Sequence, residues 1–140
     1  MNKILTFNEL NNLAEKLADY SCENTVIALI GDLGTGKTTF SQHFAKRLGV
    51  DENIKSPTFN YVLEYLSGRL PLYHFDVYRL GDVDEMDEIG YEDYFYGEGI
   101  CLIEWSERIR EILPEHPIQI TIEKDLEKGF DYRKISVNEQ

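Results

Sequence analysis

The sequence predicts an α/β fold, and three observations support this prediction. A β-branched, apolar run at residues 25–30 indicates a buried strand, and the glycine-rich stretch GDLGTGKT follows it directly at 31–38. Apolar residues then recur at helical spacing over 39–48, which indicates a helix. A second apolar run at 99–104 predicts another buried strand. Strands linked by helices, with hairpins beside them, indicate a three-layer fold like that of P-loop NTPases, whose mixed sheet has a parallel core and antiparallel additions.

The first half of the chain supplies the other elements of this fold in order. Residues 8–20 carry leucine and alanine at helical spacing, which predicts a helix. Gly49 stands where the helix after the glycine-rich stretch should end. Residues 59–66 and 70–78 are rich in aromatic and β-branched side chains, and the Ser-Gly-Arg sequence between them predicts a hairpin.

The second half of the chain completes the fold with short helices and closing strands. We expect the side chain of Ser106 to cap a helix that stops before Pro114. The expected elements are helical segments at 82–89, 92–96 and 106–113 and strands at 118–122 and 133–137.

Length and composition set bounds on the class of protein. The 140 residues, with 42% hydrophobic and 12% aromatic side chains, predict one domain over 1–140 with a real core. No apolar run reaches the ~18 residues of a membrane span, and the N-terminal residues lack a signal peptide's apolar core. Cys22 and Cys101 alone cannot form a structural zinc site and do not indicate a disulfide framework. We therefore expect a cytoplasmic protein.

The charge of the chain is strongly negative and unevenly distributed. A formal net charge of −12 argues against a bare nucleic-acid binder, whose affinity depends on basic residues. Residues 80–107 contain ten acidic side chains and no Lys, Arg or His. Two interpretations stay open: a solvated face that keeps the protein soluble, or a docking face for a basic partner.

The glycine-rich stretch carries the clearest functional signal. It matches the phosphate-binding loop pattern G-x-x-x-x-G-K-[ST] at every fixed position, between the strand and the helix that such a loop requires. The glycines let backbone N–H groups turn toward phosphates, and the helix N-terminus adds its positive dipole end. An ordinary glycine-rich turn would need no lysine followed by a hydroxyl residue. The residues expected to bind nucleotide are Asp32, Leu33, Gly34, Thr35, Gly36, Lys37, Thr38 and Thr39.

Side chains elsewhere in the chain suggest the remaining chemistry. Lys37 should reach the β- and γ-phosphates, and the Thr38 hydroxyl should bind Mg²⁺. Such a site needs a second acid at the end of a neighbouring strand, where Glu104 lies; the alternative is a surface acid. Asp76 falls inside a predicted strand, so it either pairs with a base such as Arg79 or orients the attacking water or the waters of the metal.

Several other classes of function find less support. A GTPase would show an Asn-Lys-x-Asp segment, and the chain has none. A small-molecule or nucleoside kinase would need an arginine-bearing lid, but Arg108 and Arg110 fall on a predicted helix. Neither His43 nor His116 stands in a catalytic pattern. A kinase and a nucleotide-dependent binding module remain as alternatives to an ATPase.

Four motifs in this order resemble a known family. They are GDLGTGKTT at 31–39, KSPTF at 55–59, YHFDVYRL at 73–80 and IEW at 103–105. The chain resembles the TsaE (YjeE) family of bacterial ATPases over residues 8–137. The third motif combined with the Glu-Trp step is the specific part of this resemblance, because many P-loop proteins share the first.

The resemblance implies an ATP- and Mg²⁺-dependent ATPase that acts with TsaB and TsaD, which transfer a threonylcarbamoyl group to adenosine 37 of tRNA. The ATPase would drive turnover of that complex and meet tRNA only through it, without membrane or DNA. By similarity, Thr38 and Glu104 would be the Mg²⁺ ligands, and Asp76 and Trp105 would be needed for hydrolysis. Residues 56–58 would form a nucleotide-responsive loop. The base contacts would lie near Phe7 and in a late loop near Phe130 to Arg133. Without the resemblance, a lone Trp such as Trp105 would more often be a packing residue.

Overall fold

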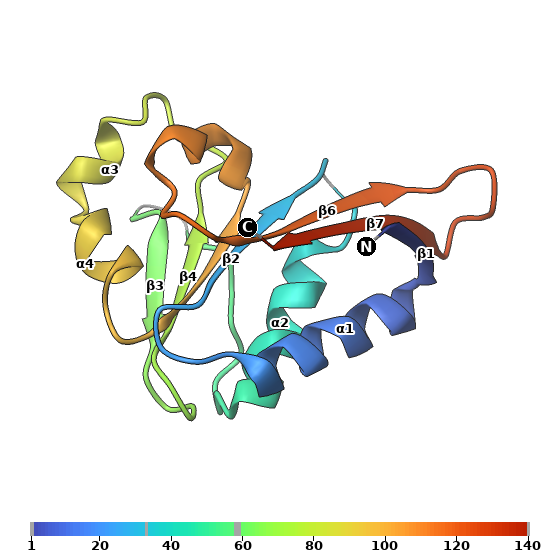
Figure 1. Cartoon of the computed structure of the whole chain (residues 1–140), viewed down its shortest axis with the longest axis horizontal. Coiled ribbons are helices and arrows are strands. Elements are labelled where there is room, and N and C mark those ends of the chain that lie inside the picture. The colour runs from blue at the N-terminus through green and yellow to red at the C-terminus, as the bar shows by residue number, and fades with distance from the viewer. Residues whose placement is uncertain (1, 33, 58–59, 140) are drawn as a thin grey trace.

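Helices cover both faces of a twisted sheet (Figure 1). The computed structural model describes residues 2–32, 34–57 and 60–139, and within them the sheet has seven strands. In chain order the elements are β1 (Asn2–Thr6), α1 (Phe7–Tyr20), β2 (Val26–Ile30), α2 (Lys37–Leu48), β3 (Val62–Tyr65), β4 (Leu72–Asp76), α3 (Glu85–Glu88), α4 (Tyr91–Phe95), β5 (Ile100–Glu104), the 3-10 segment η1 (Ser106–Ile112), β6 (Ile118–Lys124) and β7 (Tyr132–Glu139).

The strand order is β1-β7-β6-β2-β5-β4-β3. The strands β6, β2, β5 and β4 run parallel, whereas β3 at one edge and β7 and β1 at the other are antiparallel to their neighbours. The predicted α/β fold with a parallel core and antiparallel additions is therefore confirmed. Because parallel strands end at the same edge of a sheet, the carboxyl ends of β2, β4 and β5 meet, and Asp76 lies opposite Glu104 in the register.

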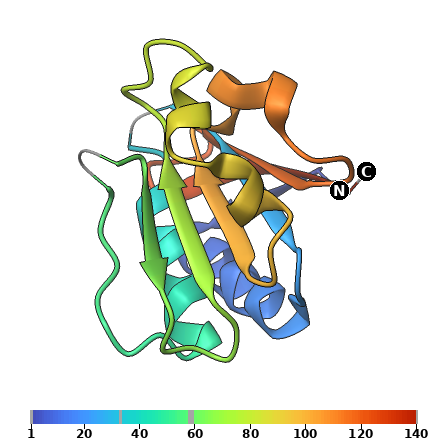
Figure 2. The same ribbon diagram turned by 90° about the vertical axis from the view of Figure 1, so that its left-hand side faces the viewer.

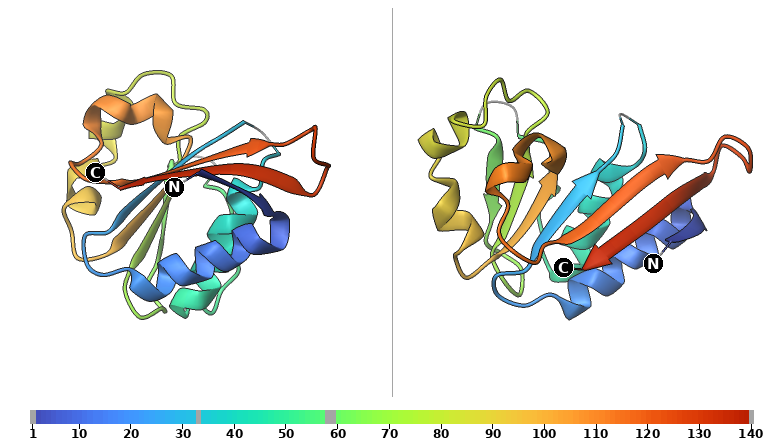
Figure 3. Two further views of the ribbon diagram at one scale, coloured as in Figure 1. Left: turned by 45° about the vertical axis from the view of Figure 1, so that its right-hand side comes forward. Right: turned by 45° about the horizontal axis from the view of Figure 1, so that its top comes forward.

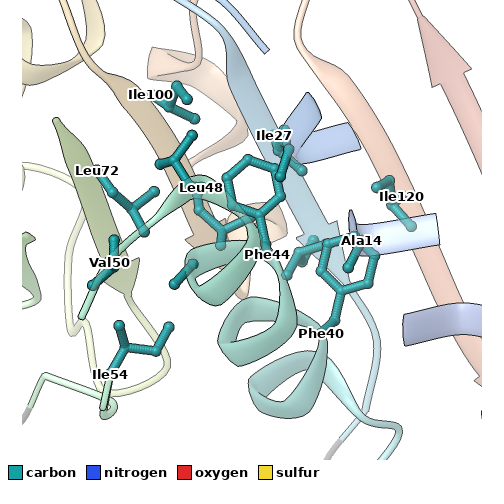
Figure 4. Packing of buried hydrophobic residues seen from close by; sticks show 14 of the residues in the cluster. Ala14, Ile27, Phe40, Phe44, Leu48, Val50, Ile54, Leu72, Ile100 and Ile120 are labelled. Carbon is teal, nitrogen blue, oxygen red and sulfur yellow. The ribbon is translucent and has the colours of Figure 1, made fainter. Parts of the chain in front are cut away.

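Three layers result, with a hydrophobic core on each face of the sheet. Figure 2 shows α3 and α4 in front of the strands, with α1 and α2 behind them, and Figure 3 shows both faces covered. The larger core lies under α1 and α2, where Phe40, Phe44 and Leu48 point from α2 toward the strands (Figure 4). The central strands β2 and β5 are apolar almost throughout because helices cover them on both faces.

Two local predictions need correction. The segment after β5 is not one α-helix but a 3-10 segment with non-helical dihedral angles at Ile109 (φ −126°, ψ 28°). Ser106 does not cap it: the N-cap position is Trp105, and the fully buried Ser106 hydroxyl instead donates to Leu29 O at 3.2 Å. The left-handed backbone of Trp105 (φ 64°) turns the chain so that the serine faces the end of β2.

One strand and the start of one helix differ from the prediction made from the sequence pattern. The strand β1 was not predicted, because its five residues pair only with β7 from the far end of the chain. The helix α2 begins at Lys37, two residues earlier than its apolar pattern indicates, since its first turn belongs to the phosphate loop. Among the described residues, no helix combines the length and apolar character needed to cross a membrane.

Candidate active site

The glycine-rich loop leads into α2 as a phosphate cradle requires. Gly36 occupies the N-cap position with a left-handed backbone (φ 110°), and no side chain caps the helix. The first N–H groups of the helix are therefore available to an anion, which the helix dipole also attracts. Inside the loop, the Thr35 hydroxyl donates to Asp32 O at 2.9 Å, which fixes the turn. A side chain at Gly36 would meet the ring of Phe7 at 3.0 Å, so the close approach of this ring also requires glycine.

Lys37 is the buried cation of the site. Its side chain is only 5% exposed, and its ammonium donates to Gly31 O and, at 3.1 Å, to Asp32 O. The same nitrogen lies 3.7 Å from the centre of the Trp105 ring. Burial lowers the pKa of Lys37, and the negative charge of Glu104 opposes that effect. The ammonium is therefore desolvated and held inside the pocket by the loop backbone and the Trp105 ring.

Glu104 is a buried carboxylate with hydrogen-bond donors on both oxygens. It is 2% exposed at the end of β5. Its Oε1 accepts from the Thr38 hydroxyl at 3.1 Å. Its Oε2 lies 3.3 Å from the Ser41 hydroxyl and 2.6 Å from Nε2 of His74. The alternative interpretation of Glu104 as a surface acid is therefore wrong.

Asp76 lies beside this carboxylate, at the last position of β4 rather than inside a strand. Its Oδ1 accepts from the Tyr78 backbone N–H at 3.1 Å. Among the described residues, Asp76 forms no ion pair, so the predicted alternative of a pair with Arg79 is not supported. The carboxylate instead faces the pocket that contains Lys37.

Trp105 lies between Lys37 and a second ring, Tyr78, which is partly exposed. The ring of Tyr78 packs against it with 4.6 Å between the ring centres, and the guanidinium of Arg108 lies 5.3 Å from the centre of the Tyr78 ring. The two rings thus lie between two cations, with Lys37 over Trp105 and Arg108 over Tyr78, an arrangement that favours both cations. Trp105 thus lines the pocket and contacts its cation, while its role in hydrolysis stays a prediction.

One pocket of about 370 Å³ unites these side chains. Its volume lies within the range typical of small-molecule sites. Phe7 lines it beside the loop, and Ser56 lines it from the segment after α2. The residues that line it are Phe7, Asp32, Gly34, Thr35, Gly36, Lys37, Thr38, Thr39, Ser56, Asp76, Tyr78, Glu104 and Trp105.

Arg133 does not line the pocket, whereas the other described residues that were predicted to bind nucleotide do. Its side chain is 5% exposed and donates to Thr35 O at 2.9 Å and to Phe130 O at 2.8 Å. The guanidinium therefore supports the phosphate loop from behind, with the Phe7 ring at 5.2 Å. The predicted contacts of Leu33, Thr58 of the predicted loop and Phe59 at the start of the predicted strand lie outside the described residues.

Three polar residues of the site escaped the sequence analysis: His74, Ser41 and Tyr78. His74 could have been noticed because a strand places residues two positions apart on the same face, so it shares a face with Asp76. Ser41 lies four residues after Lys37, on the same side of α2.

The donor set fits a Mg²⁺-nucleotide. The Thr38 hydroxyl and the Glu104 carboxylate are hard oxygen donors 3.1 Å apart. They lie at the N-terminus of α2, where the helix dipole attracts an anion. The described residues contain no cluster of three or more His, Cys, Asp or Glu side chains placed to hold a metal. A nucleotide-bound Mg²⁺ needs no such cluster, because it takes one or two protein ligands together with phosphate oxygens and waters.

The chain matches one protein-family model and is similar to several proteins of known name and to a solved structure. The family model for "Threonylcarbamoyl adenosine biosynthesis protein TsaE" matches residues 5–135. A tRNA threonylcarbamoyladenosine biosynthesis protein TsaE from Bacillus subtilis is 44% identical over 128 residues, which cover 91% of this chain and 78% of the relative. A protein of the same name from Treponema pallidum is 45% identical over 100 residues, 71% of this chain and 73% of the relative. The crystal structure of Bacillus subtilis YdiB superposes with a TM-score of 0.78 and 38% identity, covering 98% of this chain and 83% of that one.

Proposed function

This chain belongs to the TsaE family, which takes part in tRNA threonylcarbamoyladenosine biosynthesis, and on that premise we propose that it is a Mg²⁺-dependent ATPase acting with TsaB and TsaD. One observation carries the proposal. The Thr38 hydroxyl and the Glu104 carboxylate meet at 3.1 Å beside the buried Lys37, at the N-terminus of α2. A carboxylate and a hydroxyl that can bind Mg²⁺, together with a lysine that can bind phosphate, are the groups needed to cleave a phosphoanhydride bond.

The residues of the pocket divide the work of hydrolysis. The loop N–H groups and Lys37 bind the β- and γ-phosphates and position them in the pocket. Mg²⁺, held by Thr38 and Glu104, would neutralise charge that develops on the phosphate oxygens. The carboxylate of Asp76 orients the attacking water, and the ring of Trp105 holds Lys37 in place and keeps bulk water away. Hydrolysis then resets the complex with TsaB and TsaD, while those partners carry out the transfer to tRNA.

Replacing Thr38 by alanine tests the metal assignment. Thr38→Ala should weaken the binding of Mg²⁺-ATP by about tenfold or more, the lower end of the cost of disturbing metal ligation. The affinity for ATP without metal should change little, because the backbone cradle remains. Calorimetric titration with ATP in Mg²⁺ and in EDTA measures both quantities.

Thr38→Ser is the matched control, because it keeps the hydroxyl and should keep the metal dependence. Equal losses with and without Mg²⁺ would remove Thr38 from the metal site.

The acidic surface around α3 and α4 suggests how the partners dock. Of the acids predicted to form a docking face, Glu85 proves structural: its carboxylate accepts from the backbone N–H groups of Gly81 and Asp82 at 2.7 and 3.0 Å. These hydrogen bonds lower its pKa. The carboxylate of Asp82 likewise accepts from the Asp84 backbone N–H at 3.0 Å. The other exposed acids of this face are Asp84, Asp87, Glu88, Glu92, Asp93 and Glu98.

Charge reversal at Asp84, Asp87 and Glu88 should slow association with the TsaB–TsaD complex, because long-range attraction governs the on-rate. Higher salt should have the same effect on the unsubstituted protein. Surface plasmon resonance at several salt concentrations measures the rate. Nucleotide affinity should stay unchanged, since these residues lie outside the pocket.

Reversal of the exposed acids Glu23, Asp51 and Glu52 is the matched control, with the same change in net charge at the ends of α1 and α2. If both triple variants associate equally fast, the surface around α3 and α4 is only a solvated face.

A further inference from the structure

His74 is a fully buried histidine that has no role in the function described so far. It lies in β4, two residues before Asp76, with 0% of its surface exposed. Both ring nitrogens have partners: Nε2 lies 2.6 Å from Glu104 Oε2, and Nδ1 lies 3.3 Å from the backbone oxygen of Lys55. A buried polar ring with both nitrogens engaged is held in one orientation.

The two partners fix the orientation of the ring. Nε2 lies 2.6 Å from a carboxylate oxygen of Glu104, which is a short contact. Nδ1 faces the backbone oxygen of Lys55 at 3.3 Å. Lys55 therefore fixes the ring, and the ring fixes the carboxylate.

Competing donors to the same oxygen are weaker. Ser41 has one hydroxyl hydrogen, and its oxygen lies 3.0 Å from Lys37 O but 3.3 Å from Glu104 Oε2. The backbone oxygen of Lys37 is therefore the nearer acceptor for this hydrogen. The Thr38 hydroxyl contacts the other carboxylate oxygen, Oε1. His74 is thus the one firm partner of Oε2 among the described residues.

We propose that His74 is a positioning residue for the metal acid: it holds the Glu104 carboxylate in the orientation that faces Thr38. This inference rests on the proposed function, because it assigns His74 to the binding of Mg²⁺-nucleotide. Without His74, the carboxylate would lose its fixed orientation in a buried site. Outer-shell partners of metal ligands are typically worth about 10–100-fold in metal affinity or activity.

Two substitutions separate the two ring nitrogens. The amide of glutamine places a donor near the position of Nε2, so His74→Gln keeps the hydrogen bond to Glu104. The shorter amide of asparagine places its donor near Nδ1, so His74→Asn keeps only the contact with Lys55 O. Both variants bury an amide in the same space, which matches them in polarity. His43→Gln, a change at a partly exposed site on α2, is the control for histidine loss.

The readout is the effect of Mg²⁺ on ATP affinity, measured without hydrolysis. Trp105 is the single tryptophan of the chain, and its ring contacts Lys37, so its fluorescence reports nucleotide binding. We expect His74→Asn to lose about 10–100-fold of the affinity gained from Mg²⁺, while His74→Gln and His43→Gln keep it. The affinity for ATP in EDTA should be the same in all four proteins. Equal Mg²⁺ effects in the asparagine and glutamine variants would overturn the proposal.

A measurement on the unsubstituted protein decides the matter if either core variant fails to fold. The chain has three histidines, and NMR with ¹⁵N-labelled imidazole resolves their ring nitrogens. Adding Mg²⁺ to the ATP complex should shift the Nε2 signal of His74 and leave those of His43 and His116 in place. An unmoved His74 signal would contradict the proposal. Absence of any Mg²⁺ effect on ATP affinity in the unsubstituted protein would instead overturn the proposed function.

Discussion

Replacing Lys37 by alanine should abolish productive ATP binding and hydrolysis. The ammonium is the buried cation of the pocket, and loop carbonyl oxygens and the Trp105 ring hold it there in place of water. Its loss removes the charge that faces the β- and γ-oxygens, and a lost electrostatic partner in a dry site costs about 10²–10³-fold in rate. Weaker binding adds to that loss. Calorimetric titration with Mg²⁺-ATP and a phosphate-release assay measure the two effects.

Lys46→Ala is the matched control for Lys37→Ala. It removes one positive charge from the exposed side of the same helix and leaves the pocket untouched. We expect this control to bind and hydrolyse ATP like the unsubstituted protein. Normal nucleotide affinity in Lys37→Ala would mean that the glycine-rich loop is not a phosphate site.

Replacing Asp76 should separate binding from chemistry. Its proposed role belongs to the transition state, so Asp76→Asn should leave Mg²⁺-ATP affinity nearly unchanged and slow hydrolysis by ~10²–10⁴-fold, the usual value of a general base or water-positioning group. Asparagine keeps an oxygen that can accept from the Tyr78 N–H, so the turn after β4 is preserved. Single-turnover hydrolysis and equilibrium titration give the two values.

Asp76→Ala completes this comparison, because it removes both the charge and the local acceptor. Both variants should be slow, but only the alanine variant should also melt at a lower temperature. If Asp76→Asn hydrolyses ATP at the normal rate, the charge has no catalytic role, and Asp76 serves only the turn through its bond to Tyr78.

Local pattern was sufficient to predict the centre of the fold and of the site. A buried strand, a glycine loop and a helix are contiguous in sequence, so Lys37 and Thr38 could be placed without any tertiary information. Glu104 could also be placed, because parallel strands bring their carboxyl ends to the same edge and an acid at the end of an apolar run must lie there. The opposed positions of Asp76 and Glu104 in the register follow from the same rule.

Residues whose roles depend on long-range contacts could not be assigned in this way. Arg133 was expected near the base, yet its guanidinium bonds to the Thr35 backbone almost a hundred residues away. Ser106 is a residue type that often caps helices, but the left-handed backbone of Trp105 turns its hydroxyl toward β2. Glu85 is a different case: its contacts are local, but its sequence does not distinguish a carboxylate that closes a turn from the other surface acids around it. Side-chain identity indicates which bonds a residue can make, but only the folded chain determines which partner is nearest.

Measuring phosphate release from ATP by the purified protein tests directly whether it is a Mg²⁺-dependent ATPase that acts with TsaB and TsaD. The assay should be run with and without Mg²⁺, with and without TsaB and TsaD from the same source, and beside Lys37→Ala. We expect release of inorganic phosphate that requires Mg²⁺, rises when the partners are added and disappears in Lys37→Ala. Transfer of the γ-phosphate to a small-molecule acceptor would indicate a kinase. Tight ATP binding without turnover, even in the presence of both partners, would contradict the account and indicate a nucleotide-dependent binding module.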